Sequence, residues 1–225
     1  MGTARTQPRL PTRYSDPVGN AAVKRDTIAA RRAGGIPQER ARRRQAIVEA
    51  AVRVIEEHGT DIGLGTVADR AGLPRPHVYR HFASKDDLDQ AVARHAARLV
   101  SAWIRPSLTA PGTPPEVVHG IVGQVLSWAV AHPNLYRFRA RLGTAHAVPE
   151  ITEAAVANLR AAGYAAHLPA YVVASVVGMV DAGIIWWFDH RDEVGPDQLN
   201  DWLATQVWRV VAEAVQRPPA ASHDG

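Results

Sequence analysis

The sequence predicts an all-α protein of about nine helices. Apolar residues recur at spacings of three and four along most of the chain, which places them on one face of a helix. No stretch of useful length alternates apolar and polar residues, the pattern of a half-buried strand. The 16 prolines and 17 glycines separate the apolar stretches into segments of helix length.

The first helix is expected to run from Gln38 to the residue before Gly59. Ile47, Ala51 and Ile55 follow one another at intervals of four, which gives the helix an apolar face. Gly59 ends the helix, because glycine readily takes the left-handed conformation found at helix C-termini.

Two short helices with a tight bend between them are predicted within residues 63–82. The first ends at Gly72, and Leu73 and Pro74 form the bend. Pro76 lies early in the second helix, where a missing N–H leaves no hydrogen bond unmade. This is the arrangement of a helix-turn-helix, whose second helix enters the major groove of DNA.

The helix that follows is expected to begin at Ser84, a favourable N-cap, with two aspartates in its first turn. It runs to about Trp103, and Pro106 ends it. The remaining helices are expected at residues 115–131, 134–142, 149–162, 169–190 and 196–215.

Positive charge is concentrated at the N-terminal end of the chain. Residues 1–44 hold eleven Arg or Lys side chains against three acidic ones, a net charge of +8, whereas the whole chain carries +4. Of the 26 basic residues, 24 are Arg, whose planar guanidinium suits phosphates and guanine edges. The distribution indicates a negatively charged partner at this end.

Residues 68–88, ADRAGLPRPHVYRHFASKDDL, resemble the signature of the TetR family of bacterial transcription regulators. The matching parts are the Ala-x-x-Ala-Gly turn, the Tyr-x-His-Phe end of the second helix, and Ser-Lys before an acidic pair. Pro74 stands where the family usually has Ser, and His77 where it has Thr or Ser. A capping hydroxyl is therefore missing, and His77 is expected to read a different base. Gly63 and Gly65 lower the helix propensity of the segment before the turn.

The resemblance implies which residues bind DNA. Tyr79 and Lys85 would bond phosphates, Thr66 and Arg44 would anchor the DNA backbone on the other side, and Arg75 and His77 would read bases. A solvated surface charge is the simpler alternative for each Arg. The DNA-binding residues expected in full are Arg44, Thr66, Arg75, Pro76, His77, Tyr79, Arg80, His81 and Lys85.

The sequence gives little support to other chemistry. It has no cysteine, which excludes disulfides, zinc fingers and thiol catalysis. His77 and His81 have a metal-binding spacing, but no third ligand stands near them in the sequence, and His190 with its neighbouring aspartates is more simply a helix end. Phosphate-cradling glycine loops, nucleophile elbows and His-Glu-x-x-His motifs are absent. We expect no metal, no cofactor and no enzymatic activity.

The N-terminus has no apolar stretch like that of a signal peptide, so a cytoplasmic protein is expected. Residues 168–188 are apolar enough to suggest a membrane span, but they include Pro169, Gly178 and Asp181. A core helix is the better interpretation, and no membrane is expected as a partner.

The last two helices are expected to form the interface of a homodimer. Small residues recur every four positions on the first of them, and the second has a broad apolar face, as in a four-helix interface. Packing within one chain is the alternative. The expected interface residues are Ala174, Gly178, Ala182, Trp202, Leu203, Val207 and Val210.

A small-molecule effector is expected in a cavity lined by aromatic side chains of the C-terminal region. Asp181 lies in an otherwise apolar helix, so it needs a partner across the interface or in a pocket. The aromatic residues expected to line the cavity are Trp103, Trp128, Tyr136, Phe138, Tyr164, Tyr171 and Trp187.

Taken together, these patterns predict a sequence-specific repressor that a small-molecule effector releases from an inverted-repeat operator in double-stranded DNA. One alternative is a helical small-molecule-binding or enzymatic protein with a vestigial DNA-binding head; another is an effector-independent or activating DNA-binding protein. The expected organisation is a disordered basic arm (1–37), a helix-turn-helix domain (38–83), an effector-binding and dimerisation domain (84–216) and a disordered tail (217–225).

Overall fold

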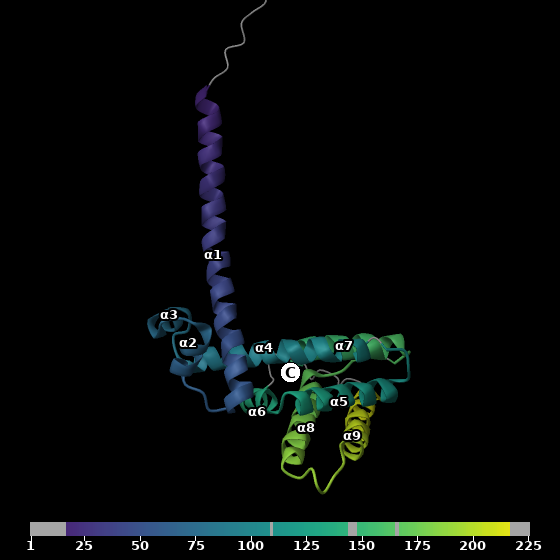
Figure 1. The fold of residues 1–225 in the computed structure, drawn as a ribbon. Coiled ribbons are helices and arrows are strands. Elements are labelled where there is room, and N and C mark those ends of the chain that lie inside the picture. The colour runs from purple at the N-terminus through teal and green to yellow at the C-terminus, as the bar shows by residue number, and fades with distance from the viewer. Residues whose placement is uncertain (1–16, 109, 144–147, 165–166, 217–225) are drawn as a thin grey trace, which may run out of the picture. The chain divides into compact units, whose positions relative to one another are not determined.

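The computed structural model describes residues 17–108, 110–143, 148–164 and 167–216, with side chains from residue 37 onward. Within these ranges it has nine α-helices and no strand, which confirms the predicted all-α class (Figure 1). The chain divides into two compact units, residues 1–44 and residues 45–225.

Helix α1 (Pro17–His58) begins well before Gln38, where we expected helical structure to start. The helix includes residues 17–37, where we expected an irregular arm. Alanine and arginine in this segment favour a helix in spite of Pro37. In the first unit, Arg43 Nε donates to Glu39 Oε1 at 2.8 Å, and this hydrogen bond lowers the pKa of Glu39. Residues 1–16 and the predicted tail at 217–225 lie outside the described residues, and the functional boundary at residue 37 stays a prediction.

The N-terminal part of the second unit is a three-helix head. It comprises the end of α1 from residue 45, α2 (Leu64–Ala71) and α3 (Arg75–His81). Gly72 follows α2 with φ at 64°, and its N–H caps the helix, so the glycine bend predicted there is confirmed. The core of the head consists of side chains that are at most 4% exposed: Ile47, Val48, Ala51, Val54, Ile55, Ile62, Val67, Ala68, Val78 and Phe82.

Helix α4 (Lys85–Leu108) belongs to the head and to the region that follows it. Ser84 Oγ accepts a hydrogen bond from Asp87 N at 3.1 Å, as expected of an N-cap. The helix continues beyond Trp103 to Leu108. Pro106 lies in its last turn and does not end it. Leu88 and Val92, both almost fully buried, pack into the same core as the head, whereas Ile104 lies at the far end of the helix.

Five further helices form the C-terminal region, where α5, α6 and α7 pack against α4 (Figure 1): α5 (Pro114–Ala131), α6 (Pro133–Leu142), α7 (Val148–Ala161), α8 (Ala170–Phe188) and α9 (Pro196–Gln216). Helix α5 packs against α4 and α9, and α8 packs against α7 and α9. A capping box between Thr113 and Glu116 begins α5.

Among the described residues, α8 is the helix long and apolar enough to cross a membrane. One of its faces is buried in the core of the chain, through Val172, Val173, Val176 and Ile184. At Gly183 the backbone approaches α9 so closely that an added Cβ would lie 3.0 Å from Leu203 Cδ2. These contacts favour the core-helix interpretation.

His95 of α4 lies beside the part of α1 that belongs to the second unit. Gln45 Nε2 and Arg98 Nη2 each lie 3.4 Å from His95 Nδ1, so this nitrogen accepts hydrogen bonds and the proton of the neutral ring is on Nε2. Burial lowers the pKa of His95, and the Arg98 charge adds to this effect, although Glu49 opposes it. The folded protein therefore holds His95 as a neutral ring near neutral pH.

We expect His95 to contribute to acid sensitivity. Because its pKa is lower in the folded than in the unfolded chain, the unfolded chain binds the extra proton as the pH falls below about 6.5. Stability is therefore full above this pH and declines below it. Denaturant unfolding at pH 7.5 and pH 5.5 should show a smaller loss of stability on acidification in His95→Gln than in the parent. His167→Gln, at an exposed position, is the control; equal losses in all three proteins would contradict the assignment.

Candidate DNA-binding head and effector cavity

Helix α3 presents a polar surface to solvent. Arg75, Pro76, Tyr79 and Arg80 are exposed, and the Tyr79 side chain is 56% exposed in spite of its aromatic ring. His77 and His81 are partly buried, so they are less available than expected. The buried face of α3 holds Val78, which fixes the helix against the core of the head.

Helix α2 lies next to α3 and is tied to α1. Thr66 is exposed on α2, and Arg70 of the same helix pairs with Glu57 near the end of α1. Arg44 belongs to the first unit and is partly buried. Within the second unit, the structure therefore brings Thr66 and the exposed α3 residues onto the same small domain.

The function of Gly65 could not be recognised from the sequence. The Arg75 side chain lies over it, and a Cβ added at Gly65 would be 2.7 Å from Arg75 Nη2. The glycine therefore gives the Arg75 guanidinium room against α2. We expected only a loss of helix propensity at this position.

Lys85 begins α4 and is already engaged in an ion pair. Its Nζ donates to Asp89 Oδ2 at 2.5 Å, and Asp89 is only 8% exposed. The side chain of Lys85 remains 40% exposed, so a phosphate could share the ammonium group with Asp89.

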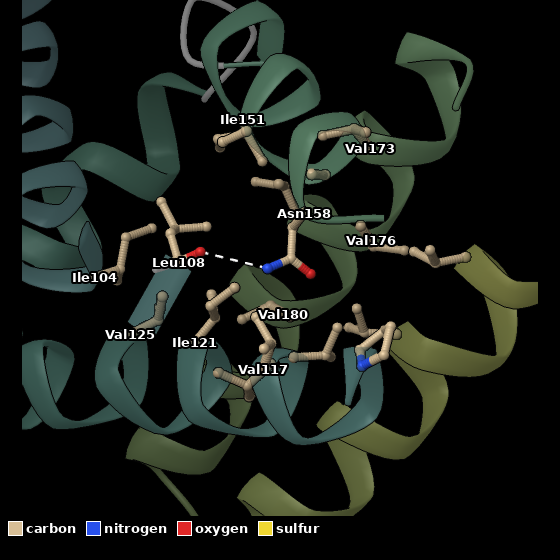
Figure 2. A pocket seen from close by; sticks show the side chains of 18 of the residues that line it. Ile104, Leu108, Val117, Ile121, Val125, Ile151, Asn158, Val173, Val176 and Val180 are labelled. Atoms are coloured by element: carbon tan, nitrogen blue, oxygen red, sulfur yellow. Dashed lines mark hydrogen bonds between the residues drawn. The ribbon is translucent and has the colours of Figure 1, made fainter. Parts of the chain in front are cut away.

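A cavity of about 820 Å³ lies in the C-terminal region, bounded by α4, α5, α7, α8 and α9. Figure 2 shows aliphatic side chains from several helices converging on it, including Ile104, Ile121, Val125, Ile151 and Val180. One polar group in this view, Asn158, donates from Nδ2 to the main-chain oxygen of Leu108 at 3.4 Å. The size is that of a site for a small organic molecule.

None of the seven aromatic residues predicted to contact the effector lines this cavity, and their contact with an effector stays a prediction. Trp128, Tyr136, Phe138 and Trp187 are buried in the packed core, where their large apolar area is best accommodated. Trp103 and Tyr171 are exposed, and Tyr164 packs edge-on against Trp208. Trp208, which we did not predict, is the aromatic residue that lines the cavity within the described part of the chain.

A buried polar cluster lies at one wall of the cavity. Asp181 Oδ1 accepts hydrogen bonds from Arg139 Nη2 at 2.5 Å and from Tyr136 Oη at 2.6 Å. Both Arg139 and Asp181 line the cavity. Burial and the Asp181 carboxylate raise the pKa of Tyr136 well above its usual value, so the phenol stays protonated and donates. Asp181 thus has its partners within its own chain.

An exposed face runs along α8 and α9. Ala174, Gly178 and Ala182 are exposed on α8, and Trp202 and Val210 on α9, with Trp202 56% exposed. Tyr171 and Trp186, which we did not assign to this face, are exposed on α8 as well.

Leu203 and Val207, which we predicted to lie at the dimer interface, are not part of this exposed face. They are 0% and 8% exposed and pack inward, since they lie on the side of α9 that faces α8 and the cavity. The apolar face of α9 is so broad that part of it packs into the core and part of it is exposed. The helical spacing of apolar residues does not distinguish these two parts.

Residues 47–92 match the profile of the bacterial regulatory proteins of the tetR family. The transcriptional repressor LfrR of Mycolicibacterium smegmatis is 42% identical over 65 residues, which is 29% of this chain and 34% of the relative. The transcriptional activator FasR of the same organism is 37% identical over 79 residues, 35% of this chain and 36% of that protein. The chain thus spans about a third of the length of these relatives.

Solved structures share the fold over most of the chain. A tetR family regulator from Shewanella has a TM-score of 0.59 at 20% identity and covers 74% of this chain and 96% of its own. RolR in complex with resorcinol has a TM-score of 0.60 at 19% identity and covers 80% of this chain and 96% of its own. Residues 47–92 thus form the helix-turn-helix domain of the tetR family of bacterial regulatory proteins, which confirms the resemblance seen in residues 68–88.

The buried ion pair predicts a specific pattern of stability. Asp181→Asn keeps an acceptor for Tyr136 but leaves the Arg139 charge buried without a counterion, and should lower the free energy of unfolding by about 3 kcal/mol. Arg139→Met combined with Asp181→Asn should recover most of that loss, because no charge is then buried. Urea unfolding followed by circular dichroism measures both variants. A double variant less stable than Asp181→Asn would contradict this account.

Proposed function

We propose that this protein is a DNA-binding transcription regulator, a repressor that a small-molecule effector releases from an inverted-repeat operator. The observation that carries the proposal is one helix, α4, whose first half packs into the DNA-binding head and whose second half lines a large apolar cavity. The small-molecule effector that the sequence predicts would bind in this cavity and not among the aromatic side chains of the core. Because the proposed partner is DNA, the cytoplasm is the location we propose for the protein.

In this proposal the exposed surface of α3 contacts DNA. Arg75 reads a base edge in the major groove, from the position that Gly65 leaves open to it. Tyr79 and Lys85 bind phosphates and set the orientation of the head, while Pro76, His77, Arg80, His81 and Thr66 complete the contact surface of the head. Arg44, which belongs to the first unit, anchors the DNA backbone in this proposal. The three-helix core supports the proposal, because it holds α3 in one position.

A second connection between the cavity and the head runs through α6. Arg139 of this helix lies at the cavity wall, and His132 Nδ1, at its N-terminal end, lies 2.8 Å from Glu56 Oε1 of α1. Asn134 Nδ2 donates to the main-chain oxygen of Glu56 at 3.0 Å. A ligand that shifts Arg139 thus has a path to the head in addition to α4. Release requires that the effector bind the two head arrangements with different affinities.

Repression is the direction we propose. Relatives of this chain include a repressor, LfrR, and an activator, FasR. Deleting the gene should raise the transcripts of neighbouring genes; a fall would indicate an activator. A bound small molecule in RolR, which shares the fold, supports a ligand in the cavity of this chain.

The proposed homodimer forms through the exposed α8 and α9 face, with Ala174, Gly178, Ala182, Trp202 and Val210 at its centre. Small side chains on α8 allow a helix of a second copy to approach closely. Exposed tryptophans on the same face supply the large apolar contacts that stabilise protein interfaces. Two heads related by a two-fold axis would fit half-sites about 34–36 Å apart, or a multiple of this spacing.

Two substitutions on α3 should have different effects on DNA binding. Tyr79→Phe removes one hydroxyl and should weaken binding about tenfold on every duplex, as expected for one hydrogen bond to a charged phosphate. Arg75→Ala should cost about 1–3 kcal/mol on the preferred site and reduce the preference for it. Gel shifts with DNA from upstream of the gene, at increasing salt, measure both.

Arg160→Ala, at an exposed position on α7, is the control and should bind like the parent. Binding by the parent should fall steeply with salt, because phosphate contacts release counterions. If the parent does not bind DNA at low salt, the head is vestigial and the protein is a small-molecule-binding protein.

Gly178 offers a clean test of the dimer, because an added Cβ would meet nothing within 4 Å in its own chain. Gly178→Trp should leave the monomer folded and raise the dimer dissociation constant at least about tenfold, since the bulk separates the two copies. Sedimentation equilibrium measures this constant. Ser127→Trp, exposed on α5, is the matched control and should stay dimeric. A Gly178→Trp protein as dimeric as the control would place the interface elsewhere.

A further inference from the structure

We propose that the cavity takes an uncharged, mainly aliphatic molecule with one hydrogen-bond acceptor, which binds Nε of Arg139. The inference rests on the proposed effector function and specifies its ligand class. It follows from three features of the cavity: the chemistry of its wall, an unused buried donor and the balance of buried charge.

The cavity wall is aliphatic over most of its area. Valine, isoleucine, leucine and alanine side chains from five helices line it, and Figure 2 shows ten of the lining residues by name. Trp208 is the aromatic residue at the wall within the described chain, and its ring packs edge-on against Tyr164. A flat aromatic ligand would therefore have little to stack on, whereas a flexible hydrocarbon chain can fill the space.

Arg139 supplies the unused donor. The residue is 5% exposed, and its Nε–H has no hydrogen-bond partner among the described residues. Its Nη2 donates a hydrogen bond to Asp181, and its guanidinium lies 4.7 Å from the centre of the Tyr136 ring. Buried N–H groups are rarely left without an acceptor, and a ligand oxygen in the cavity would provide one.

The buried charges at this wall cancel. Arg139 and Asp181 form a 1:1 ion pair, and Tyr136 remains a neutral phenol that donates to the same carboxylate. A ligand carboxylate at Arg139 would be brought close to Asp181 with no second buried cation to compensate for it. Arg105 and Glu150 also line the cavity, but both are exposed and opposite in sign. A neutral carbonyl or ether oxygen satisfies the donor without this repulsion.

Calorimetric titration of the full chain with methyl ketones of increasing length tests the ligand class. Affinity should rise roughly fourfold per added methylene from 2-hexanone through 2-octanone to 2-decanone, as expected for burial of apolar surface. Decanoate should bind at least about tenfold more weakly than 2-decanone at pH 7.5. An affinity that does not change with chain length, or decanoate binding as tightly as the ketone, would overturn the proposal.

Variants locate the binding in the cavity. Ile121→Trp fills the space and should abolish ketone binding, whereas Val130→Trp, exposed on the same helix, should not change it. Arg139→Met with Asp181→Asn should lose about tenfold in 2-decanone affinity and keep the dependence on chain length. Unchanged affinity in this double variant would overturn the role of Arg139. Circular dichroism melting first confirms that each variant is folded.

Operator affinity, measured with and without 2-decanone, distinguishes a failure of the proposed ligand class from a failure of the proposed function. Ketone binding that Ile121→Trp abolishes, without any change in operator affinity, would contradict effector release and leave the ligand class standing. Tighter binding of decanoate, with a change in operator affinity, would contradict the ligand class and leave the regulator standing.

Discussion

The structure depends on the burial of α4 in two places at once. Near its start, Leu88 and Val92 are at most 1% exposed and complete the core of the head. Toward its end, Val100 and Ile104 form part of the cavity wall. A helix transmits a displacement along its axis because its backbone hydrogen bonds are continuous, and close packing of its first half leaves little freedom of movement at the head. Any ligand that moves the second half of α4 therefore acts on the head.

The cavity and the buried cluster both cost the fold stability. A space of about 820 Å³ forgoes packing contacts that a filled core would make, and the Arg139–Asp181 pair is costly to desolvate. Neither feature is needed to build a stable helical bundle. Both are explained if the site exists to hold a ligand, since ligand binding restores the missing contacts and supplies an acceptor to Arg139. The same cluster belongs to α6, which contacts Glu56 in the head through His132 and Asn134.

Much of the fold could be predicted from the sequence, and less of the site. Local signals were sufficient where one residue fixes the backbone: Gly72 at the end of α2 and Ser84 before α4 lie where expected. Helical spacing alone could not assign a function to a side chain, because a wide apolar face can point to the core, the cavity or solvent. For this reason the spacing did not reveal that Leu203 and Val207 are buried within the chain, or that none of the seven predicted aromatic residues lines the cavity. The aliphatic cavity depends on five helices far apart in the sequence and has no local signature.

In the proposed dimer, a rigidly held α3 of each copy reads one half of a two-fold symmetric DNA site. Preferred sites can be selected from randomised duplexes at low salt with the full chain. We expect the selection to enrich an inverted repeat with half-sites one helical turn, or a multiple of it, apart. A pool that remains random after several rounds, or that enriches a single unrepeated site, would contradict it.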